Sequence, residues 1–301
     1  MKYNITNEKI TLYLTETEKQ YTLEKLFEIF DISRKNRYLL KMNHQILLDD
    51  RPLLQDNEAL NGNELCILRE KENPDWIAAE RPAKVVFEND LVTIVHKEAG
   101  IIIHGEETDT TCLNARVARY YLDHNIHSFV RPIHRLDKDT CGLVLYVKVA
   151  FFQPWFDKQL QLKNIYRHYL AICMGKRPKK DFTCNLRIGK DRHNAGKYRI
   201  SSSGKEARTF FTLEDSKKDY HLIGCRLDTG RTHQIRVHLS AYGLSIVNDP
   251  LYGIYTRDFK HMGLWADTIT FRNPLNNKKH TIYDFPQEDY KLFLDTNDNT
   301  K

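Results

Sequence analysis

A polar segment with two prolines divides the chain into two parts that differ in their hydrophobic pattern. Residues 71–83 contain Pro74 and Pro82, which is typical of a linker. Before this segment helical and strand-like patterns alternate, and after it short strand-like runs predominate. The 301 residues are enough for two units that each bury a core. We therefore expect a small unit over residues 1–70, a larger one over 84–287 and a polar tail over 288–301.

The small unit combines two predicted helices with short strands. Thr22 can cap a helix whose face carries Leu23, Leu26, Phe27 and Phe30. A second helix is expected from Ser33, with Leu39 and Leu40 directed to the core. Three of its cations share one face: Arg34, Arg37 and Lys41. Strands are expected over residues 45–48 and 64–68, with a turn at Asn61-Gly62 between them.

The larger unit is predicted to be rich in strands. The expected strands lie at residues 85–87, 91–96, 101–103, 143–147 and 169–173, with further antiparallel strands between 197 and 225. Helices are expected over residues 114–122 and 155–162. A third helix of about ten residues is expected between an N-cap at Thr232 and Gly243 just past its end.

Composition excludes several classes of protein. The longest apolar runs, such as Leu143–Val147, are far shorter than the ~20 residues that a membrane span needs. Residues 1–14 mix charged with apolar residues and do not resemble a signal peptide. The six cysteines form no C-x-x-C pair, which favours reduced thiols over a zinc site or a disulfide framework. We expect a cytoplasmic protein with no metal, no membrane partner and, by default, a monomeric state.

Basic residues are concentrated in one part of the chain. The formal net charge is only +6, but residues 151–240 hold 19 basic and 8 acidic residues. Such a segment is typical either of a solvated basic surface or of a surface that binds a polyanion. Aromatic residues interleaved with the cations, among them Tyr166, Tyr169 and Tyr198, favour the nucleic-acid interpretation.

One polar loop carries candidate catalytic groups directly before a predicted buried strand. Residues 131–142 include His134, Arg135, Asp137 and Asp139, and loops next to buried strands often hold reactive groups. Two carboxylates two residues apart are compatible with a general acid and base. The alternative is a turn whose side chains only cap backbone groups.

Two further segments combine polar and apolar residues. Residues 228–243 place His233, Arg236 and Ser240 on one face of the predicted helix, where they are either surface residues or functional groups. Zinc binding is a weaker interpretation, because His233 and His238 are five residues apart and no H-E-x-x-H motif occurs. Tyr169 lies on a predicted strand that ends at a glycine, where a packed core tyrosine is the default.

These segments together resemble the RluA family of pseudouridine synthases. The first is similar to its H-R-L-D-x-x-T-S-G signature, residues 166–175 to its K-x-Y-x-A-x-x-x-G strand, and residues 228–243 to its T-G-R-T-H-Q-I-R-V-H-L element. Further similarity follows in order over residues 86–104, 188–207 and 244–253, so that it covers roughly residues 84–287. Residues 32–41 more loosely resemble an S4-type RNA-binding domain.

The resemblance implies a fold and an activity. The fold would be α+β, with a mixed and largely antiparallel sheet and a central cleft, preceded by a small S4-like α/β domain. The activity would be isomerisation of specific uridines in structured RNA, ribosomal RNA first and transfer RNA second, with the nucleotide flipped out of its stack. Such an isomerisation needs no redox or energy cofactor, and none is expected.

The resemblance also implies roles for individual residues. Asp137 would be the nucleophile, Arg236 would keep it ionised, and Tyr169 would pack against the uracil and help to move its C5 proton. Arg135 would fill the space left by the flipped nucleotide. RNA would be held by His134, Arg231 and His233 and, on the small unit, by Arg34, Arg37 and Lys41.

The sequence departs from the family pattern at four positions and leaves two other functions open. Cys141, Arg167, Asn248 and Trp265 stand where Ser, Lys, Gly and His are usual. One alternative is an RNA-binding protein without catalysis on the same scaffold. The other is a glycosidase that uses Asp137 and Asp139, which requires carboxyl groups ~5–9.5 Å apart across a sugar.

Overall fold

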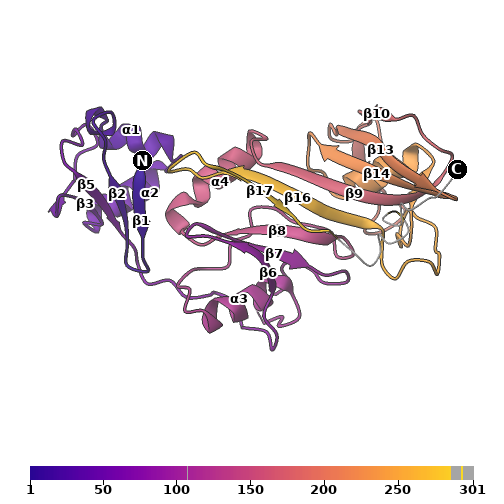
Figure 1. Cartoon of the computed structure of the whole chain (residues 1–301), viewed down its shortest axis with the longest axis horizontal. Helices are drawn as coiled ribbons and strands as arrows, with labels where there is room; N and C mark the ends of the chain where they lie inside the picture. The colour runs from indigo at the N-terminus through magenta and orange to yellow at the C-terminus, as the bar shows by residue number, and fades with distance from the viewer. Residues whose placement is uncertain (107, 286–292, 294–301) are drawn as a thin grey trace, which may run out of the picture.

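The protein is an α+β structure with two sheets that are joined through residues 71–83. The computed structural model describes residues 1–106, 108–285 and 293. Figure 1 shows the N-terminal unit at one end of the molecule and β10, β13 and β14 at the opposite end. The predicted polar tail over 288–301 lies, apart from Phe293, outside the described residues.

The N-terminal unit consists of a five-stranded sheet and two α-helices. Its strands follow the order β1-β2-β5-β3-β4, and every pairing is antiparallel. The elements are β1 (Lys2–Ile5), β2 (Lys9–Tyr13), the 3-10 helix η1 (Glu18–Gln20), α1 (Leu23–Ile29), α2 (Arg34–Met42), β3 (Ile46–Leu48), β4 (Arg51–Pro52) and β5 (Glu64–Leu68).

The larger unit is built on one mixed, largely antiparallel sheet. The strand order is β10-β13-β14-β9-β16-β8-β7-β6, with β15 on β9 and β17 on β16. Among these pairings in the described chain, only β16 with β8 is parallel. The strands are β6 (Lys84–Glu88), β7 (Val92–Lys97), β8 (Cys141–Val147), β9 (Tyr166–Gly175), β10 (Asp181–Cys184), β13 (Thr209–Lys217), β14 (Tyr220–Leu227), β15 (Leu244–Ile246), β16 (Leu264–Arg272) and β17 (Lys279–Tyr283).

A hairpin, three α-helices and one 3-10 helix complete the larger unit. The hairpin pairs β11 with β12 and stands apart from the main sheet. These elements are β11 (Ile188–Lys190), β12 (Tyr198–Ile200), α3 (Leu113–Asp123), the 3-10 helix η2 (Ala150–Phe152) with α4 (Gln153–Gln161), and α5 (Gln234–Ala241).

Helices α3 and α5 cover the same face of the sheet at different places. Leu113 of α3 and Leu239 of α5 belong to one buried cluster, which also contains Val144 of β8 and Ile223 of β14. Residues of β8 that point to the opposite face, such as Leu145, pack with α4 in a second cluster. Because α3 and α5 cover only the two ends of their face, the sheet between them is available to form a site.

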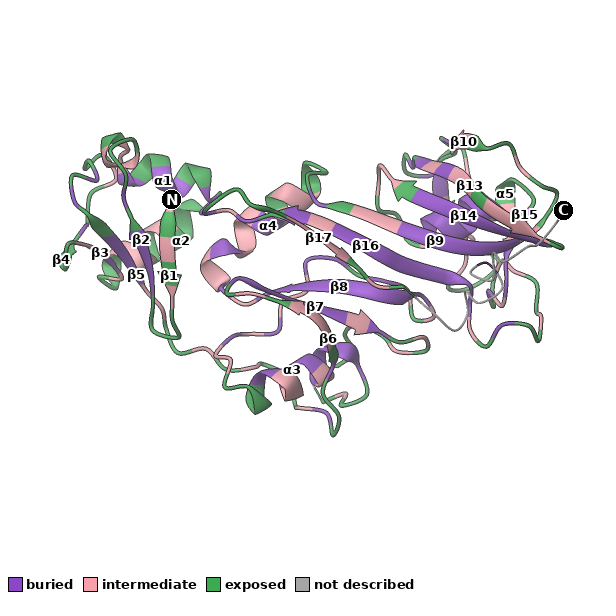
Figure 2. Cartoon of the chain, in the orientation of Figure 1, coloured by how far each residue is buried: buried purple, intermediate pink, exposed green. Residues whose placement is uncertain are grey.

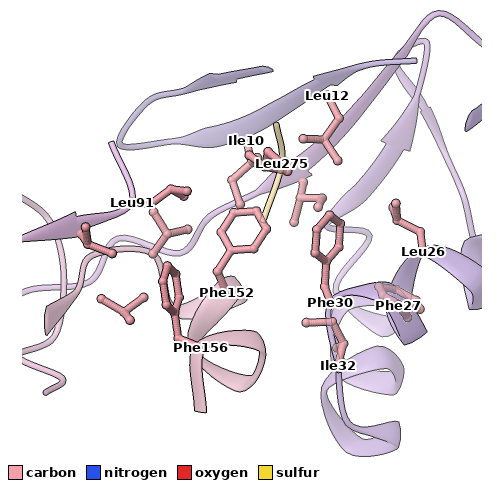
Figure 3. Close-up of a cluster of buried hydrophobic side chains, with 14 of the residues drawn as sticks. Ile10, Leu12, Leu26, Phe27, Phe30, Ile32, Leu91, Phe152, Phe156 and Leu275 are labelled. Carbon is pink, nitrogen blue, oxygen red and sulfur yellow. The ribbon is translucent and has the colours of Figure 1, made fainter. Parts of the chain in front are cut away.

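The N-terminal unit shares its core with the larger unit. Ile10 of β2 and Phe30 after α1 are buried together with Phe152 and Phe156 (Figure 3). The ring of Phe30 meets that of Phe152 edge-on at a centroid distance of 5.2 Å. Arg69 adds hydrogen bonds from its guanidinium to carbonyl oxygens on both sides of the contact. The predicted small unit therefore has its own sheet but not a separate core.

Most predicted elements are present, including the Thr22 and Ser33 caps of α1 and α2. The strand predicted at residues 101–103 is wrong: the carbonyls of Ile102 and Ile103 instead accept hydrogen bonds from the first residues of α3. Leu39 was expected in the core but is exposed, because α2 buries none of its residues. Strands β1 and β2 were not predicted at all.

Two further expectations need correction. Thr232 is not the cap of α5, because the helix begins one residue later and the N-cap is His233 in a left-handed conformation. The 71–83 segment contains no helix or strand, as predicted, but it is not a loose tether: the amide of Ala79 donates to a carbonyl of α3, and Asp75 accepts from the amide of Val130. In the described part of the chain, no helix is long and apolar enough to cross a membrane.

Candidate active site

A polar cleft opens on the sheet face between α3 and α5. Its volume is about 820 Å³, and its lining comes from the 102–104 segment, the 134–140 loop, β9 and residues 226–236. Elements that are far apart in the sequence therefore contribute to one cavity. All three catalytic residues predicted from the sequence line it: Asp137, Tyr169 and Arg236. Four of the predicted RNA-binding residues line it as well: His134, Arg135, Arg231 and His233.

Asp137 and Arg236 form an ion pair within the cleft. The Nη1 atom of Arg236 donates to Oδ2 of Asp137 at 2.9 Å, although the two residues are 99 positions apart in the sequence. The Asp137 side chain is 26% exposed, whereas that of Arg236 is almost fully buried. The other carboxylate oxygen, Oδ1, has no hydrogen-bond partner among the described residues and is free to meet a ligand.

The guanidinium of Arg236 is fixed from behind by a second carboxylate. Its Nε and Nη2 atoms donate to the two oxygens of Asp249 at 2.7 and 2.8 Å, a bidentate arrangement with both groups buried. Burial alone would lower the pKa of Arg236, but the hydrogen bonds and charges of Asp249 and Asp137 outweigh it and raise that pKa above its ordinary value. Arg236 is therefore a permanent cation whose orientation is set before any ligand binds.

The loop that carries Asp137 is held by a buried lysine. Lys97 at the end of β7 is fully buried, and its ammonium donates to the carbonyl oxygens of Lys138 and Glu98 at 2.7 and 2.9 Å. Burial lowers the pKa of Lys97 to about 8.

The same loop ends at a glycine that the sheet requires. Gly142 has a φ of +109°, and a Cβ atom there would lie 2.3 Å from the carbonyl oxygen of Ala266. Only glycine therefore lets β8 approach β16 this closely.

Tyr169 lies on the cleft side of β9 and is 4% exposed. Burial raises the pKa of its hydroxyl, while the nearby Arg167 cation opposes this shift. The phenol therefore keeps its proton at neutral pH. It presents an aromatic ring to the cavity, which suits contact with a planar base better than acceptance of a proton.

Arg135 and Arg231 are exposed at the mouth of the cleft. Arg135 has no hydrogen bond or ion pair with any described residue, so its guanidinium is available to an incoming ligand. The Nε atom of Arg231 donates a hydrogen bond to the carbonyl oxygen of Glu206 at 2.8 Å. Asp139 does not line the cleft, so the carboxylate pair required by the glycosidase alternative is not assembled there.

His134 differs from the RNA-binding role expected for it. The residue is buried, and its Nε2 atom faces the backbone amide of Leu145 at 3.4 Å. Burial lowers the pKa of His134 to about 3, and the Arg167 cation acts in the same direction. The imidazole is therefore neutral at physiological pH and offers no charge to a phosphate; its contacts indicate that it supports β8.

The predicted basic face of α2 lies outside the cleft lining, and most of its cations already have partners. The Nε atom of Arg37 donates to the carbonyl of Ile32 at 2.8 Å, and Lys41 pairs with Asp56 at 2.8 Å. Of the three predicted contacts, Arg34 alone is exposed without a partner among the described residues.

Sequence reasoning missed several residues of the site. Asp249, Tyr252 and Lys97 were given no role, although all three lie in stretches with family resemblance, residues 86–104 and 244–253. The guanidinium of Arg236 lies over the ring of Tyr252, with its Cζ atom 5.2 Å from the ring centroid. The sequence signal for Asp249 was weak, because a single acidic residue before a proline is typical of a turn. The only sequence signal for Lys97 was that one cation ends a largely apolar run.

A carboxylate fixed by a permanent cation, beside an aromatic ring in a large polar cleft, is an arrangement typical of an active site that receives a polar substrate. Comparison with known proteins specifies the class further. The family model of RNA pseudouridylate synthase matches residues 91–241, which include Asp137, Tyr169 and Arg236. The chain belongs to this family, in its RluA branch, and is an isomerase that forms pseudouridine in RNA.

Individual relatives agree with this assignment. The chain is 32% identical over 243 residues to the uncharacterised RNA pseudouridine synthase YhcT of Bacillus subtilis strain 168, covering 79% of this chain and 78% of the relative. It is 30% identical over 276 residues to ribosomal large subunit pseudouridine synthase D of Xanthomonas campestris pv. campestris, with coverage of 85% and 81%. Human RNA pseudouridylate synthase domain containing 1 shares the fold, with a TM-score of 0.57 at 20% identity over 68% of this chain and 84% of that one. The predicted family, the fold class of the larger unit and the reaction are thus confirmed, whereas the S4-like assignment of the N-terminal unit stays a prediction.

Proposed function

We propose that the enzyme modifies uridines of large-subunit ribosomal RNA and that Asp137 is its nucleophile. The relatives that carry a substrate in their name, such as the Xanthomonas protein, are ribosomal large subunit synthases. The observation that carries the catalytic assignment is the Asp137 carboxylate, with Oδ2 fixed by Arg236 and Oδ1 open to the cleft. Transfer RNA is the second candidate substrate.

In this proposal Oδ1 of Asp137 acts at the sugar of a flipped uridine. The C1′–N1 bond breaks with its electron pair on the uracil, the base turns, and C5 bonds to C1′. The Arg236 hydrogen bond to Oδ2 limits the rotation of the carboxylate, so the nucleophile needs little reorganisation on binding. The same geometry serves attack at C1′ and removal of a sugar proton by Asp137.

Tyr169 and Arg135 have complementary roles in holding the flipped nucleotide. The uracil stacks on the Tyr169 ring in the cleft, whereas the Arg135 guanidinium occupies the gap that the nucleotide leaves in the RNA. Flipping costs a few kcal/mol, and the absence of an intramolecular partner for Arg135 among the described residues supports its availability for this purpose. Arg231 and the cations of residues 176–208 contact phosphates.

The N-terminal unit, over residues 1–70, is proposed to be an S4-like RNA-binding domain, and residues 84–287 to be the catalytic domain. Arg34 of α2 is its principal phosphate contact, with smaller contributions from Arg37 and Lys41 because these already pair within the chain. The enzyme is proposed to work as a monomer in the cytoplasm.

Asp137→Asn tests the catalytic proposal, with Asp139→Asn as the matched control in the same loop. Loss of the nucleophile is expected to lower the single-turnover rate by at least about 10³-fold, while RNA affinity stays within about twofold. Asp139 does not line the cleft, so its variant should keep most of the activity. Persistence of pseudouridine formation in Asp137→Asn would make the catalytic assignment wrong and favour another nucleophile.

The substrate is tested by mapping pseudouridines in a strain without the gene against its parent. We expect one or a few sites to disappear from large-subunit ribosomal RNA and to return when the wild-type gene, but not the Asp137→Asn gene, is supplied. Loss of sites only from transfer RNA would overturn the ribosomal assignment without affecting the role of Asp137.

A further inference from the structure

His233 occupies an unusual backbone conformation at the edge of the catalytic cleft. Its φ and ψ are 56° and 22°, a left-handed conformation that costs a residue with a side chain roughly 1–2 kcal/mol. The conformation is held by α5, because the His233 carbonyl accepts from the amide of Val237 at 2.9 Å. Strain of this kind is concentrated at functional sites, and here it places the imidazole in the cleft, with Nε2 3.8 Å from Oδ2 of Asp137.

The far side of the imidazole is fixed by a tyrosine. Nδ1 of His233 lies 2.9 Å from the hydroxyl oxygen of Tyr252, which also accepts from the backbone amide of Tyr198 at 2.7 Å. In the tautomer with its hydrogen on Nδ1, that hydrogen goes to the Tyr252 oxygen, and Nε2 presents a lone pair to the cleft. The rings of Tyr198 and Tyr252 meet the imidazole edge-on and prevent it from turning away.

Pseudouridine formation needs a proton to be moved after the base is reattached. Once C5 has bonded to C1′, it still carries its hydrogen, and N1 is an imine nitrogen. The C5–H bond must break with its electron pair forming C5=C6, while the N1=C6 π pair takes up a proton at N1. A group in the cleft must therefore accept one proton and supply one.

Three other groups of the cleft are poorly suited to this transfer. Burial raises the pKa of Tyr169, so its phenol does not accept a proton. His134 directs Nε2 to the amide of Leu145, and Asp137, released from the sugar once C5 has bonded to C1′, is hydrogen-bonded to Arg236 through Oδ2. Burial lowers the pKa of His233, although the Asp137 charge opposes this, and the imidazole is neutral with an available nitrogen at neutral pH.

We propose that Nε2 of His233 accepts the C5 proton of the rearranged base and returns a proton to N1, with Tyr252 as the residue that positions the ring. The intermediate imidazolium lies beside the Asp137 carboxylate, which stabilises it. This step rests on the proposed role of Asp137, since it requires that the uridine react beside that carboxylate. It replaces the contribution to proton movement that the sequence assigned to Tyr169.

The test compares His233→Asn with the wild type on large-subunit ribosomal RNA transcribed with uridine or with uridine deuterated at C5. Asparagine tolerates the left-handed conformation, so the backbone of α5 should be preserved. We expect the single-turnover rate to fall by about 10²-fold or more, with a C5 deuterium isotope effect above that of the wild type and unchanged RNA affinity. His124→Gln, at the exposed end of α3, is the control and should behave as the wild type.

Two further measurements complete the test. Tyr252→Phe keeps the ring under Arg236 but loses the hydroxyl, and it should show a smaller loss of rate with a raised isotope effect. In the wild type the rate should fall at acidic pH as His233 becomes protonated, and this decline should be absent in His233→Asn. The groups that face His233 or act on its charge are Asp137, Asp249, Arg236, Tyr198 and Tyr252, and all of these remain in the variant.

A slower His233→Asn enzyme without an isotope effect would overturn the proposal, as would a variant that loses only RNA affinity. Asp137→Asn is measured in parallel. If His233→Asn is fully active while Asp137→Asn is inactive, only the proton-transfer role is wrong; if Asp137→Asn is active, the proposed nucleophile is wrong.

Discussion

The catalytic cleft and helix α2 both present arginines, but they hold them in opposite ways. In the cleft, Arg236 is buried between two carboxylates that use three of its nitrogens. On α2 no residue is buried, and Arg34 and Lys35 project into solvent without a partner in the described chain. Figure 2 shows the same contrast for whole elements: β8 is buried along its length, whereas α2 has only intermediate and exposed residues.

The difference separates two uses of positive charge. A buried and fully hydrogen-bonded cation has one orientation and can set the geometry of a reacting group, but loss of a partner is expensive. An exposed cation has many orientations and adds affinity for phosphates at little cost to folding. Substitutions in the two regions should therefore differ in kind as well as in size.

Asp249→Asn is expected to have a large effect on both the rate and the stability. Asparagine keeps the volume and still accepts from the amides of Leu251 and Tyr252 at Oδ1, but Arg236 loses its bidentate charged partner. We expect the rate to fall by about 10²-fold and the free energy of unfolding by about 3 kcal/mol, measured by single-turnover kinetics and urea denaturation. Asp123→Asn, which breaks an exposed pair on α3, should cost less than about 1 kcal/mol. Equal effects of the two variants would remove the distinction between buried and exposed charge.

Phe30→Ala tests whether the N-terminal unit, which carries α2, and the larger unit, which carries the cleft, unfold as one cooperative structure. Phe30 lies between the N-terminal unit and Phe152, and its loss should destabilise the whole chain by about 3–5 kcal/mol in a single transition. Tyr38→Ala on α2, where the side chain is 60% exposed, is the control and should change stability by less than about 0.5 kcal/mol. A Phe30→Ala protein in which the N-terminal unit unfolds alone, before an unshifted transition of the rest, would show that the shared core does not couple the units.

The parts that could be predicted from sequence depend on local patterns. Residues 143–147 form a buried strand because a continuous apolar run of that length is compatible with a core strand, and Thr22 and Ser33 were recognised because capping is a local interaction. The pairing of Asp137 with Arg236 spans 99 residues, so it followed from family resemblance and not from spacing.

The parts that could not be predicted depend on tertiary contacts. Asp249 contributes through a buried ion pair that no local sequence pattern predicts. The start of α5 was misassigned because Thr232 is a favourable capping residue, whereas the N-cap is His233 in a left-handed conformation. The burial of His134 has the same origin: it lies in a loop rich in charged residues, but the fold places it beneath β8. Exposed and buried polar side chains therefore look alike in sequence.

The buried imidazole of His134 should make stability depend on pH. Its pKa is lowered to about 3 in the fold, whereas the unfolded residue titrates near its ordinary pKa of about 6.5. The stabilisation is complete above about pH 6.5 and is lost as the pH falls towards 3, because protons bind the unfolded chain first. At pH 5 the loss should be about 2 kcal/mol.

His134→Gln provides the measurement. The difference between the unfolding free energies at pH 7 and pH 5 should be about 2 kcal/mol smaller in the variant than in the wild type, whatever the variant costs at pH 7. His238, whose pKa is also lowered by burial, titrates in both proteins and cancels. Identical pH dependence in the two proteins would mean that His134 is accessible to protons in the folded state.

The smallest effect on folding, and a selective one on binding, is expected for Arg34→Ala with Lys35→Ala. Neither side chain has a partner in the described chain, so stability should change by less than about 0.5 kcal/mol. If both contact phosphates, the slope of log affinity against log salt should become shallower by about 1.8 for duplex RNA treated as B-DNA, or about 1.4 for single strands. The rate within the bound complex should not change, because these residues lie outside the cleft lining.

Lys19→Ala with Lys25→Ala is the matched control, because these two cations already pair with Glu16 and Glu28. This double variant should leave the salt dependence of RNA affinity unaltered. If both double variants change the salt dependence equally, the net charge and not the position of α2 governs RNA binding.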